Sequence, residues 1–222
     1  MASYKPGMDW TREERSRLMQ TPHSQQPVRG DRIRQATKGV VEAIAGGFVR
    51  LGIGPNALTL SGFILSGIAG WLAANGAYTG AGLVFLLGSS LDAFDGAVAR
   101  IGGRASRFGA LFDSTLDRYG EMALLAGLGY HLAQEGAWLG LALTFAAIAG
   151  SCMVSYVRAR SEGLGIPNEV GLLTRLERCI VMIIALLSQQ VMIGLWILAI
   201  LTQVTVIQRI WSAYRLTREE QQ

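Results

Sequence analysis

Apolar residues in this chain are gathered into long runs separated by short polar turns. Six runs come close to the ~20 residues that a helix needs to cross the hydrocarbon core of a bilayer. They lie at roughly residues 57–75, 79–99, 108–132, 136–158, 172–189 and 191–213. The turns near residues 75–80, 134–136 and 188–190 are so short that the helices they join must run antiparallel. The pattern therefore predicts an all-α membrane protein with six transmembrane helices.

A basic amphipathic segment precedes the first apolar run. Between residues 29 and 52 apolar residues recur at helical spacing, while Arg32, Arg34 and Lys38 occupy the polar side. This pattern is typical of a helix on an anionic membrane surface, although a helix of a soluble bundle would share its periodicity. We therefore expect four regions along the chain. They are a polar cytosolic tail at 1–28, an amphipathic interfacial juxtamembrane helix at 29–52, a six-helix transmembrane domain at 53–215 and a cytosolic tail at 216–222.

Lysine and arginine residues set the expected orientation. They are confined to the N-terminal region, to residues 100–118 and 158–178, and to the C-terminal end. With six spans these four regions all lie on one side, which the positive-inside rule assigns to the cytoplasm. We therefore expect a multi-pass protein of the cytoplasmic (inner) membrane with both termini inside.

The charge and cysteine content argue against several classes of protein. Only 16% of the residues are charged, against about 25% in an ordinary soluble domain. The formal net charge is +4, but the basic residues are spread among apolar runs rather than gathered on one soluble face, which argues against a nucleic-acid partner. Cys152 and Cys179 have no metal-ligand spacing, and we interpret both as packing residues.

Four aspartates lie where the second predicted span ends and the third begins. Asp92 and Asp95 are three residues apart, so they share one helical face. Asp113 and Asp117 are four residues apart and share another. The short loop between the two helices allows both acidic faces to meet near the cytoplasmic surface.

These carboxylates need a compensating positive charge. An aspartate at the centre of a spanning helix costs roughly 2.5–3.5 kcal/mol on translocon scales. The nearby Arg100, Arg104 and Arg107 are a weak match, because an arginine usually pairs with a single carboxylate. Mg²⁺ or Mn²⁺, which prefer oxygen ligands, match the site better. The alternative interpretations are a buried salt-bridge network and the ion pathway of a cation or proton transporter.

The sequence around these aspartates resembles a known motif. The stretch from Asp92 to Arg100 reads D-x-x-D-G-x-x-A-R, and the stretch from Gly109 to Asp117 reads G-x-x-x-D-x-x-x-D. Both are similar at every defined position to the motif of the CDP-alcohol phosphatidyltransferase family. The resemblance implies an enzyme of phospholipid biosynthesis. Such an enzyme transfers a phosphatidyl group from a CDP-lipid, such as CDP-diacylglycerol, to an alcohol and releases CMP.

The resemblance also implies roles for individual residues. Two metal ions, Mg²⁺ or Mn²⁺, would be held by Asp92, Asp95, Asp113 and Asp117. Asp117 would also be the catalytic base that takes the proton of the acceptor hydroxyl. The residues expected to contact the CDP-lipid are Asn56, Thr59, Asp92, Gly96, Arg100 and Ser106.

Three arginines on the predicted cytoplasmic side point to the acceptor. Arg158, Arg178 and Arg209 would bind a phosphorylated alcohol, because guanidinium groups bind phosphate bidentately. Ordinary positive-inside anchoring also accounts for each of them taken alone. Residues 155–162 read S-Y-V-R-A-R-S-E and resemble the S-Y-x-K-A-R-x-E stretch of phosphatidylinositol phosphate synthases. Residues 174–178 read T-R-L-E-R and match the E-R-P-E-R stretch of those enzymes only in part.

The resemblance therefore favours inositol 1-phosphate as the acceptor and phosphatidylinositol phosphate as the product. Within the family the alternatives are a phosphatidylglycerophosphate synthase, which uses glycerol phosphate, and an archaetidylinositol phosphate synthase, which uses an ether-lipid donor. Glu121 continues the face of Asp117 by one more turn and would orient the acceptor or a helix. A homodimer is implied by the resemblance alone.

Overall fold

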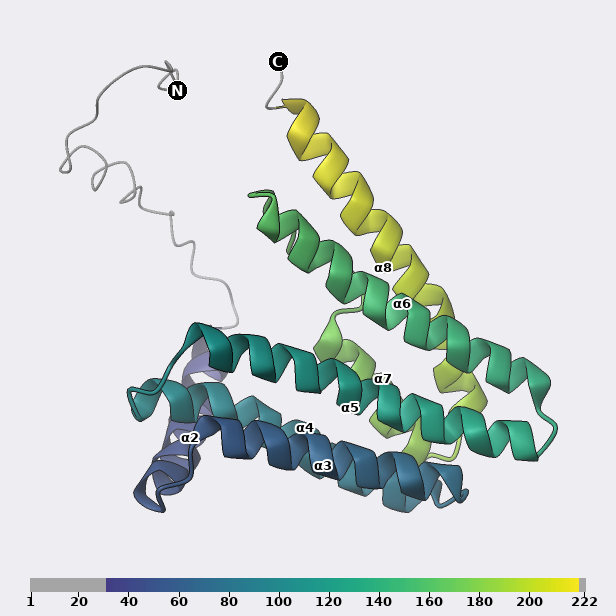
Figure 1. The fold of residues 1–222 in the computed structure, drawn as a ribbon, viewed down its shortest axis with the longest axis horizontal. Coiled ribbons are helices and arrows are strands. Elements are labelled where there is room, and N and C mark those ends of the chain that lie inside the picture. The colour runs from purple at the N-terminus through teal and green to yellow at the C-terminus, as the bar shows by residue number, and fades with distance from the viewer. Residues whose placement is uncertain (1–30, 220–222) are drawn as a thin grey trace. The chain divides into compact units, whose positions relative to one another are not determined.

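The computed structural model describes residues 31–219, and every element in that range is a helix. The chain divides into two units, residues 1–40 and 41–222, and helix α2 (Asp31–Arg50) runs from one into the other. The helices that follow are α3 (Pro55–Ala74), α4 (Tyr78–Ile101), α5 (Arg107–Gln134), α6 (Trp138–Gly163), α7 (Arg175–Leu187) and α8 (Val191–Glu219) (Figure 1). The all-α prediction is confirmed for this range. The predicted tail at 1–28 lies outside the described residues.

The helices of the second unit pack in the order α4, α3, α5, α6, α8, α7, so two pairs of neighbours are exchanged relative to the sequence. Helix α3 packs against both α4 and α5, α5 packs against α6, and α6 lies along α8 (Figure 1). Helix α7 packs between α4 and α8 and so joins the two ends of the series. The tight turns that close the hairpins use Gly76 (φ 72°) and Gly136 (φ 69°), where only glycine adopts the left-handed conformation without strain.

Glycines bring the backbones of α3 and α5 into direct contact. A Cβ atom on Gly127 of α5 would lie 1.9 Å from the carbonyl oxygen of Gly70 on α3. A Cβ on Gly70 would lie 2.4 Å from the carbonyl oxygen of Ala123. Membrane helices associate through such small residues, because lipid offers them no hydrophobic driving force toward one another. The contact holds α5, which carries Asp113 and Asp117, firmly against α3.

Four of the described helices are long and apolar enough to cross a membrane, namely α3, α4, α6 and α8. Helix α5 has the length but carries Asp113, Asp117, Arg118 and Glu121 between residues 113 and 121. Helix α7 has 13 residues, and at 1.5 Å per residue it spans only about 20 Å. The four helices thus identify a membrane protein, whereas the six-span arrangement stays an interpretation.

The predicted span at 172–189 is shortened at its start by the segment that enters α7. Residues 168–174 are not helical, and side chains of α8 satisfy their backbone instead. The amide of Leu172 donates to Gln208 Oε1 at 3.2 Å, and the amide of Leu173 donates to Thr205 Oγ1 at 3.1 Å. Helix α7 therefore begins at Arg175, three residues later than the apolar pattern predicts.

The C-terminal half of α2 packs on the ends of α3 and α4. Ala45 is buried in a small apolar cluster with Leu58, Ala97 and Val98. Phe48 and Val49 cover this cluster from the α2 side. This packing fixes the position of the segment that leads into Pro55, and it places the start of α3 beside the end of α4. The expected membrane-surface role of the helix at 29–52 stays a prediction.

Candidate active site

The four aspartates lie on two helices that face each other across a short loop. Asp92 and Asp95 belong to α4, and Asp113 and Asp117 belong to α5. All four carboxylates are within electrostatic range of one another, as the spacing predicts. Ser106 caps the start of α5, because its hydroxyl accepts a hydrogen bond of 2.9 Å from the amide of Gly109. The cap fixes the residue at which α5 begins and thereby the helical face on which Asp113 lies.

Asp95 is held by a hydrogen bond from the first helix of the group. Its side chain is buried, and Oδ2 accepts a hydrogen bond of 2.6 Å from the hydroxyl of Thr59. The same hydroxyl lies 3.2 Å from the carbonyl oxygen of Pro55. Thr59 was expected to contact a CDP-lipid, and here it orients a carboxylate of the cluster.

Asp92 occupies space that a glycine on α3 leaves open. A Cβ atom on Gly62 would lie 1.9 Å from Asp92 Oδ1, so even alanine would clash with the carboxylate. Nothing in the sequence marks Gly62 as part of the site. A glycine within an apolar helix has no feature that separates a packing role from a role beside a carboxylate.

Arg175, the first residue of α7, contacts two of the aspartates. Its Nη2 donates to Asp92 Oδ2 at 2.8 Å and lies 2.7 Å from Asp117 Oδ1. The contact with Asp117 is too poorly aligned for a hydrogen bond, and Asp117 Oδ1 is buried without a hydrogen-bond partner. Arg175 belongs to the T-R-L-E-R stretch, but the resemblance implied no role for it.

The donor set has the chemistry of a divalent-metal centre. Four carboxylates supply the oxygen ligands that Mg²⁺ and Mn²⁺ prefer. Asp117 Oδ1 lies 2.7 Å from Arg175 Nη2 but accepts no hydrogen bond, so a bound ion would supply the coordination that it lacks. Within residues 31–219, however, no three Asp, Glu, His or Cys side chains are already arranged around one ion position. Arg175 bridges two of the expected ligands instead. The exact ligand set stays a prediction.

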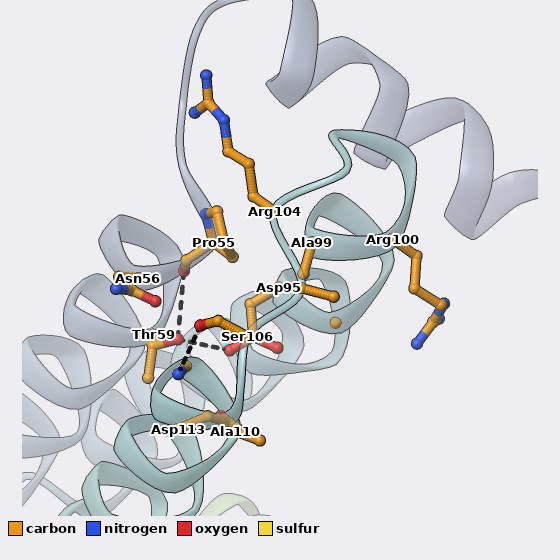
Figure 2. A pocket seen from close by; sticks show the side chains of 13 residues that line it. Pro55, Asn56, Thr59, Asp95, Ala99, Arg100, Arg104, Ser106, Ala110 and Asp113 are labelled. Carbon is orange, nitrogen blue, oxygen red and sulfur yellow. Dashed lines mark hydrogen bonds between the residues drawn. The ribbon is translucent and has the colours of Figure 1, made fainter.

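A cavity of about 220 Å³ opens beside the acidic cluster, between the starts of α3 and α5 and the end of α4 (Figure 2). Asp95 and Asp113 line it. Five of the six residues expected to contact a CDP-lipid also line it, namely Asn56, Thr59, Gly96, Arg100 and Ser106. Asp92, the sixth, is not among the lining residues. Figure 2 shows the side chains of Arg100 and Arg104 projecting away from Asp95.

The three arginines expected to bind an acceptor phosphate lie in different environments. Arg178 is 1% exposed and forms a bidentate pair with Glu121, at 2.7 Å from Nε and 2.9 Å from Nη2. Arg209 is buried and donates to the carbonyl oxygens of Val170 and Val154. Arg158 is exposed and pairs with Glu162 at 2.8 Å. Their role as phosphate ligands stays a prediction, because protein groups occupy their donors here.

Comparison with known proteins adds a second line of evidence. Residues 53–211 match the family model described as CDP-alcohol phosphatidyltransferase. The archaetidylinositol phosphate synthase of Pyrococcus horikoshii is 38% identical over 183 residues, which cover 82% of this chain and 95% of that protein. The phosphatidylinositol phosphate synthase of Corynebacterium glutamicum is 32% identical over 189 residues, which cover 81% of this chain and 86% of that protein.

Solved structures agree with these matches. The fold is similar to the crystal structure of Mycobacterium tuberculosis phosphatidylinositol phosphate synthase with CDP-DAG bound, with a TM-score of 0.73 and 28% identity. That similarity covers 79% of this chain and 94% of the other. The same enzyme in complex with manganese and citrate is similar with a TM-score of 0.69.

Proposed function

This chain belongs to the CDP-alcohol phosphatidyltransferase family, and we propose that it transfers a phosphatidyl group from CDP-diacylglycerol to inositol 1-phosphate with release of CMP. One observation carries this proposal. Asp95 and Asp113 line the same cavity as Asn56, Gly96 and Ser106, so two of the proposed metal ligands adjoin the space that would take the nucleotide. A CDP-lipid that entered this cavity would bring its pyrophosphate to the carboxylates.

The reaction needs a base and a neutralised pyrophosphate. Asp92, Asp95, Asp113 and Asp117 would hold two ions, Mg²⁺ or Mn²⁺, which when bound offset the charge of the phosphates and of the departing CMP. Asp117 accepts the proton of the acceptor hydroxyl. The hydroxyl oxygen then bonds to the phosphorus that carries the lipid. The bond from that phosphorus to the bridging oxygen breaks, and its electron pair leaves with CMP.

The acceptor follows from the relatives and from the basic residues. The relatives described above are named for inositol phosphate products, which supports inositol 1-phosphate over glycerol 3-phosphate. Arg158, Arg178 and Arg209 are the proposed ligands of the acceptor phosphate. For Arg178 this role requires release of Glu121, which holds it here.

A second donor is favoured by a specific observation. The archaetidylinositol phosphate synthase is more similar to this chain than the bacterial phosphatidylinositol phosphate synthase, at 38% against 32% identity. A CDP-activated ether lipid is therefore the alternative donor for the same site and the same acceptor. The acyl or ether linkage lies beyond the phosphate that reacts, so the chemistry of transfer is unchanged.

A CMP-release assay with purified protein tests both proposals. We expect CMP release that requires Mg²⁺ or Mn²⁺ and inositol 1-phosphate, with far less from glycerol 3-phosphate or free inositol. Parallel reactions with CDP-diacylglycerol and CDP-archaeol identify the donor. Asp113→Asn is the matched inactive control. Faster release with glycerol 3-phosphate than with inositol 1-phosphate would overturn the acceptor, and cation flux without any CMP release would overturn the reaction.

The proposed enzyme sits in the cytoplasmic membrane with six spans. In this arrangement α5 and α7 are the two further spans beside the four apolar helices. Residues 29–52 form the interfacial helix, and residues 53–215 form the catalytic domain. Both termini and the active site face the cytoplasm, and the protein is a homodimer. Impermeant maleimide labelling of single cysteines at Arg160 and Gln189 tests the orientation, because the two positions are expected on opposite sides. Chemical crosslinking in membranes tests the dimer.

A further inference from the structure

Arg175 differs in its contacts from Arg178, the other arginine of α7 near the site. Its ion pairs are with Asp92 and Asp117, both of which are proposed metal ligands. Arg178, one helical turn later, is instead committed to Glu121, which lies outside the four-aspartate cluster. A divalent ion that binds the aspartates must therefore compete with Arg175 and not with Arg178.

Arg175 is also held less completely than its neighbour. Arg178 directs both Nε and Nη2 at Glu121 and is 1% exposed. Arg175 makes both of its acidic contacts through Nη2, and its Nε is buried without a hydrogen-bond partner. An arginine that uses only some of its guanidinium N–H donors is easier to displace than one in a bidentate pair.

The surroundings leave Arg175 room to move. The side chains of Asp92 and Asp117 are 8% and 9% exposed, whereas that of Arg175 is 38% exposed. Part of the Arg175 side chain therefore already lies at the protein surface, although its Nε is buried, while the two carboxylates are almost fully covered. Displacement needs a rotation of a long side chain and no movement of a helix.

We propose that Arg175 is the internal counter-cation of the metal-free site, and that metal binding displaces it from Asp92 and Asp117. The inference rests on the proposed function only in taking these aspartates as metal ligands. Before the ion binds, the guanidinium offsets repulsion among four carboxylates in a partly buried cluster. Removal of Arg175 should therefore make the site bind metal more tightly and make the metal-free protein less stable.

The first test measures Mn²⁺ binding with no lipid or acceptor present. Free Mn²⁺ is quantified by electron paramagnetic resonance for wild type, Arg175→Ala, Arg175→Gln and Arg175→Lys in detergent. A neighbouring unit charge changes the affinity of a carboxylate for a proton by about ten- to a thousandfold, so we expect at least about tenfold tighter Mn²⁺ binding in the two neutral variants. Arg175→Lys keeps the charge and should stay near wild type. Arg215→Ala, which removes an exposed arginine of α8, is the matched control and should not change the affinity.

The second test measures thermal unfolding in EDTA and in Mn²⁺. We expect Arg175→Gln to unfold at a lower temperature than wild type in EDTA and to regain most of the difference when Mn²⁺ is added. Unchanged or weaker Mn²⁺ binding in the neutral variants, with wild type binding normally, would overturn the inference and leave the metal centre intact. Mn²⁺ binding by none of the proteins would overturn both the inference and the metal centre.

Discussion

At the scale of single residues, Asp92 depends on a position that carries no side chain. Gly62 lies on α3, and an added Cβ would approach Asp92 Oδ1 to 1.9 Å and its Cγ to 3.0 Å. The carboxylate would have to leave the position in which Arg175 Nη2 donates to its Oδ2. A site built to place oxygen ligands tolerates an error of only about 0.5 Å, so a methyl group at this position is enough to disturb it.

We therefore expect Gly62→Ala to reduce the rate of CMP release and the Mn²⁺ affinity by about 10–100-fold, the usual cost of misplacing a metal ligand. Gly67→Ala is the matched control, because Gly67 lies on the same helix and an added Cβ would meet nothing within 4 Å. It should retain wild-type activity. Equal activity of the two variants would show that Asp92 is not positioned through α3.

The hydroxyl of Thr59 has two candidate roles, which are to contact the nucleotide and to orient Asp95. It lines the cavity expected to take a nucleotide, and it donates to Asp95 Oδ2 at 2.6 Å. If its main role is to orient Asp95, Thr59→Val should weaken Mn²⁺ binding by about 10–100-fold in the absence of lipid. Thr59→Ser, which keeps the hydroxyl, should bind Mn²⁺ as wild type does. An unchanged Mn²⁺ affinity with a raised KM for CDP-diacylglycerol would instead make Thr59 a nucleotide contact.

At the scale of helices, a buried ion pair joins α5 to α7. Glu121 and Arg178 are 5% and 1% exposed and meet through two hydrogen bonds. Loss of one member of such a pair leaves a buried charge without its partner and costs about 3–5 kcal/mol. The pair also explains why α7, which is short for a membrane helix, has a defined position against α5.

Arg178→Ala should therefore lower the unfolding temperature markedly, and adding Glu121→Ala should recover part of the loss. The double variant separates stability from substrate binding. If Arg178 also binds the acceptor phosphate, the double variant should keep a KM for inositol 1-phosphate at least about tenfold above wild type, in line with loss of one charged hydrogen bond. A recovered unfolding temperature with a wild-type KM would remove Arg178 from the acceptor site.

Most helices were predictable from periodicity, and the exceptions have a physical cause. The predicted spans at 57–75 and 79–99 correspond to α3 (Pro55–Ala74) and α4 (Tyr78–Ile101), because continuous apolar runs and glycine turns mark their ends. The start of α7 was not predictable. It depends on hydrogen bonds that the amides of Leu172 and Leu173 donate to Gln208 and Thr205 on α8, which lie more than 30 residues away in the chain.

At the scale of the whole molecule, contacts between segments that are distant in the sequence also limit how much of the site was predictable. The proximity of the four aspartates follows from helical spacing and a short loop, so it could be read from residues 92–117. The entry of Arg175 into the cluster depends on where α7 begins and on its packing against α4. Neither is visible in local periodicity, and so the sequence pointed to Arg178 as the functional arginine of this stretch while Arg175 had no assigned role.

The segment between α6 and α7 determines where α7 begins and thereby the position of Arg175. Asn168 is 1% exposed and donates to Ser161 Oγ at 3.0 Å and to the carbonyl oxygen of Arg209 at 3.0 Å. Arg209 in turn donates to the carbonyl oxygen of Val170 at 2.9 Å. Asn168 and Arg209 thus fasten this segment to both α6 and α8.

Asn168→Ala should release the segment and lower the stability of the whole bundle. The loss of two buried hydrogen bonds costs about 1–3 kcal/mol. For a chain of this length that corresponds to a fall in unfolding temperature of about 2–4 °C per kcal/mol. The matched control is Asn75→Ala, which removes one exposed hydrogen bond of 2.7 Å to Trp71 in another turn and should change the unfolding temperature little. Limited proteolysis should cut Asn168→Ala faster than wild type within residues 164–174. If both asparagine variants unfold at the wild-type temperature and resist cleavage equally, the segment is positioned by the helices alone and not by the hydrogen bonds of Asn168.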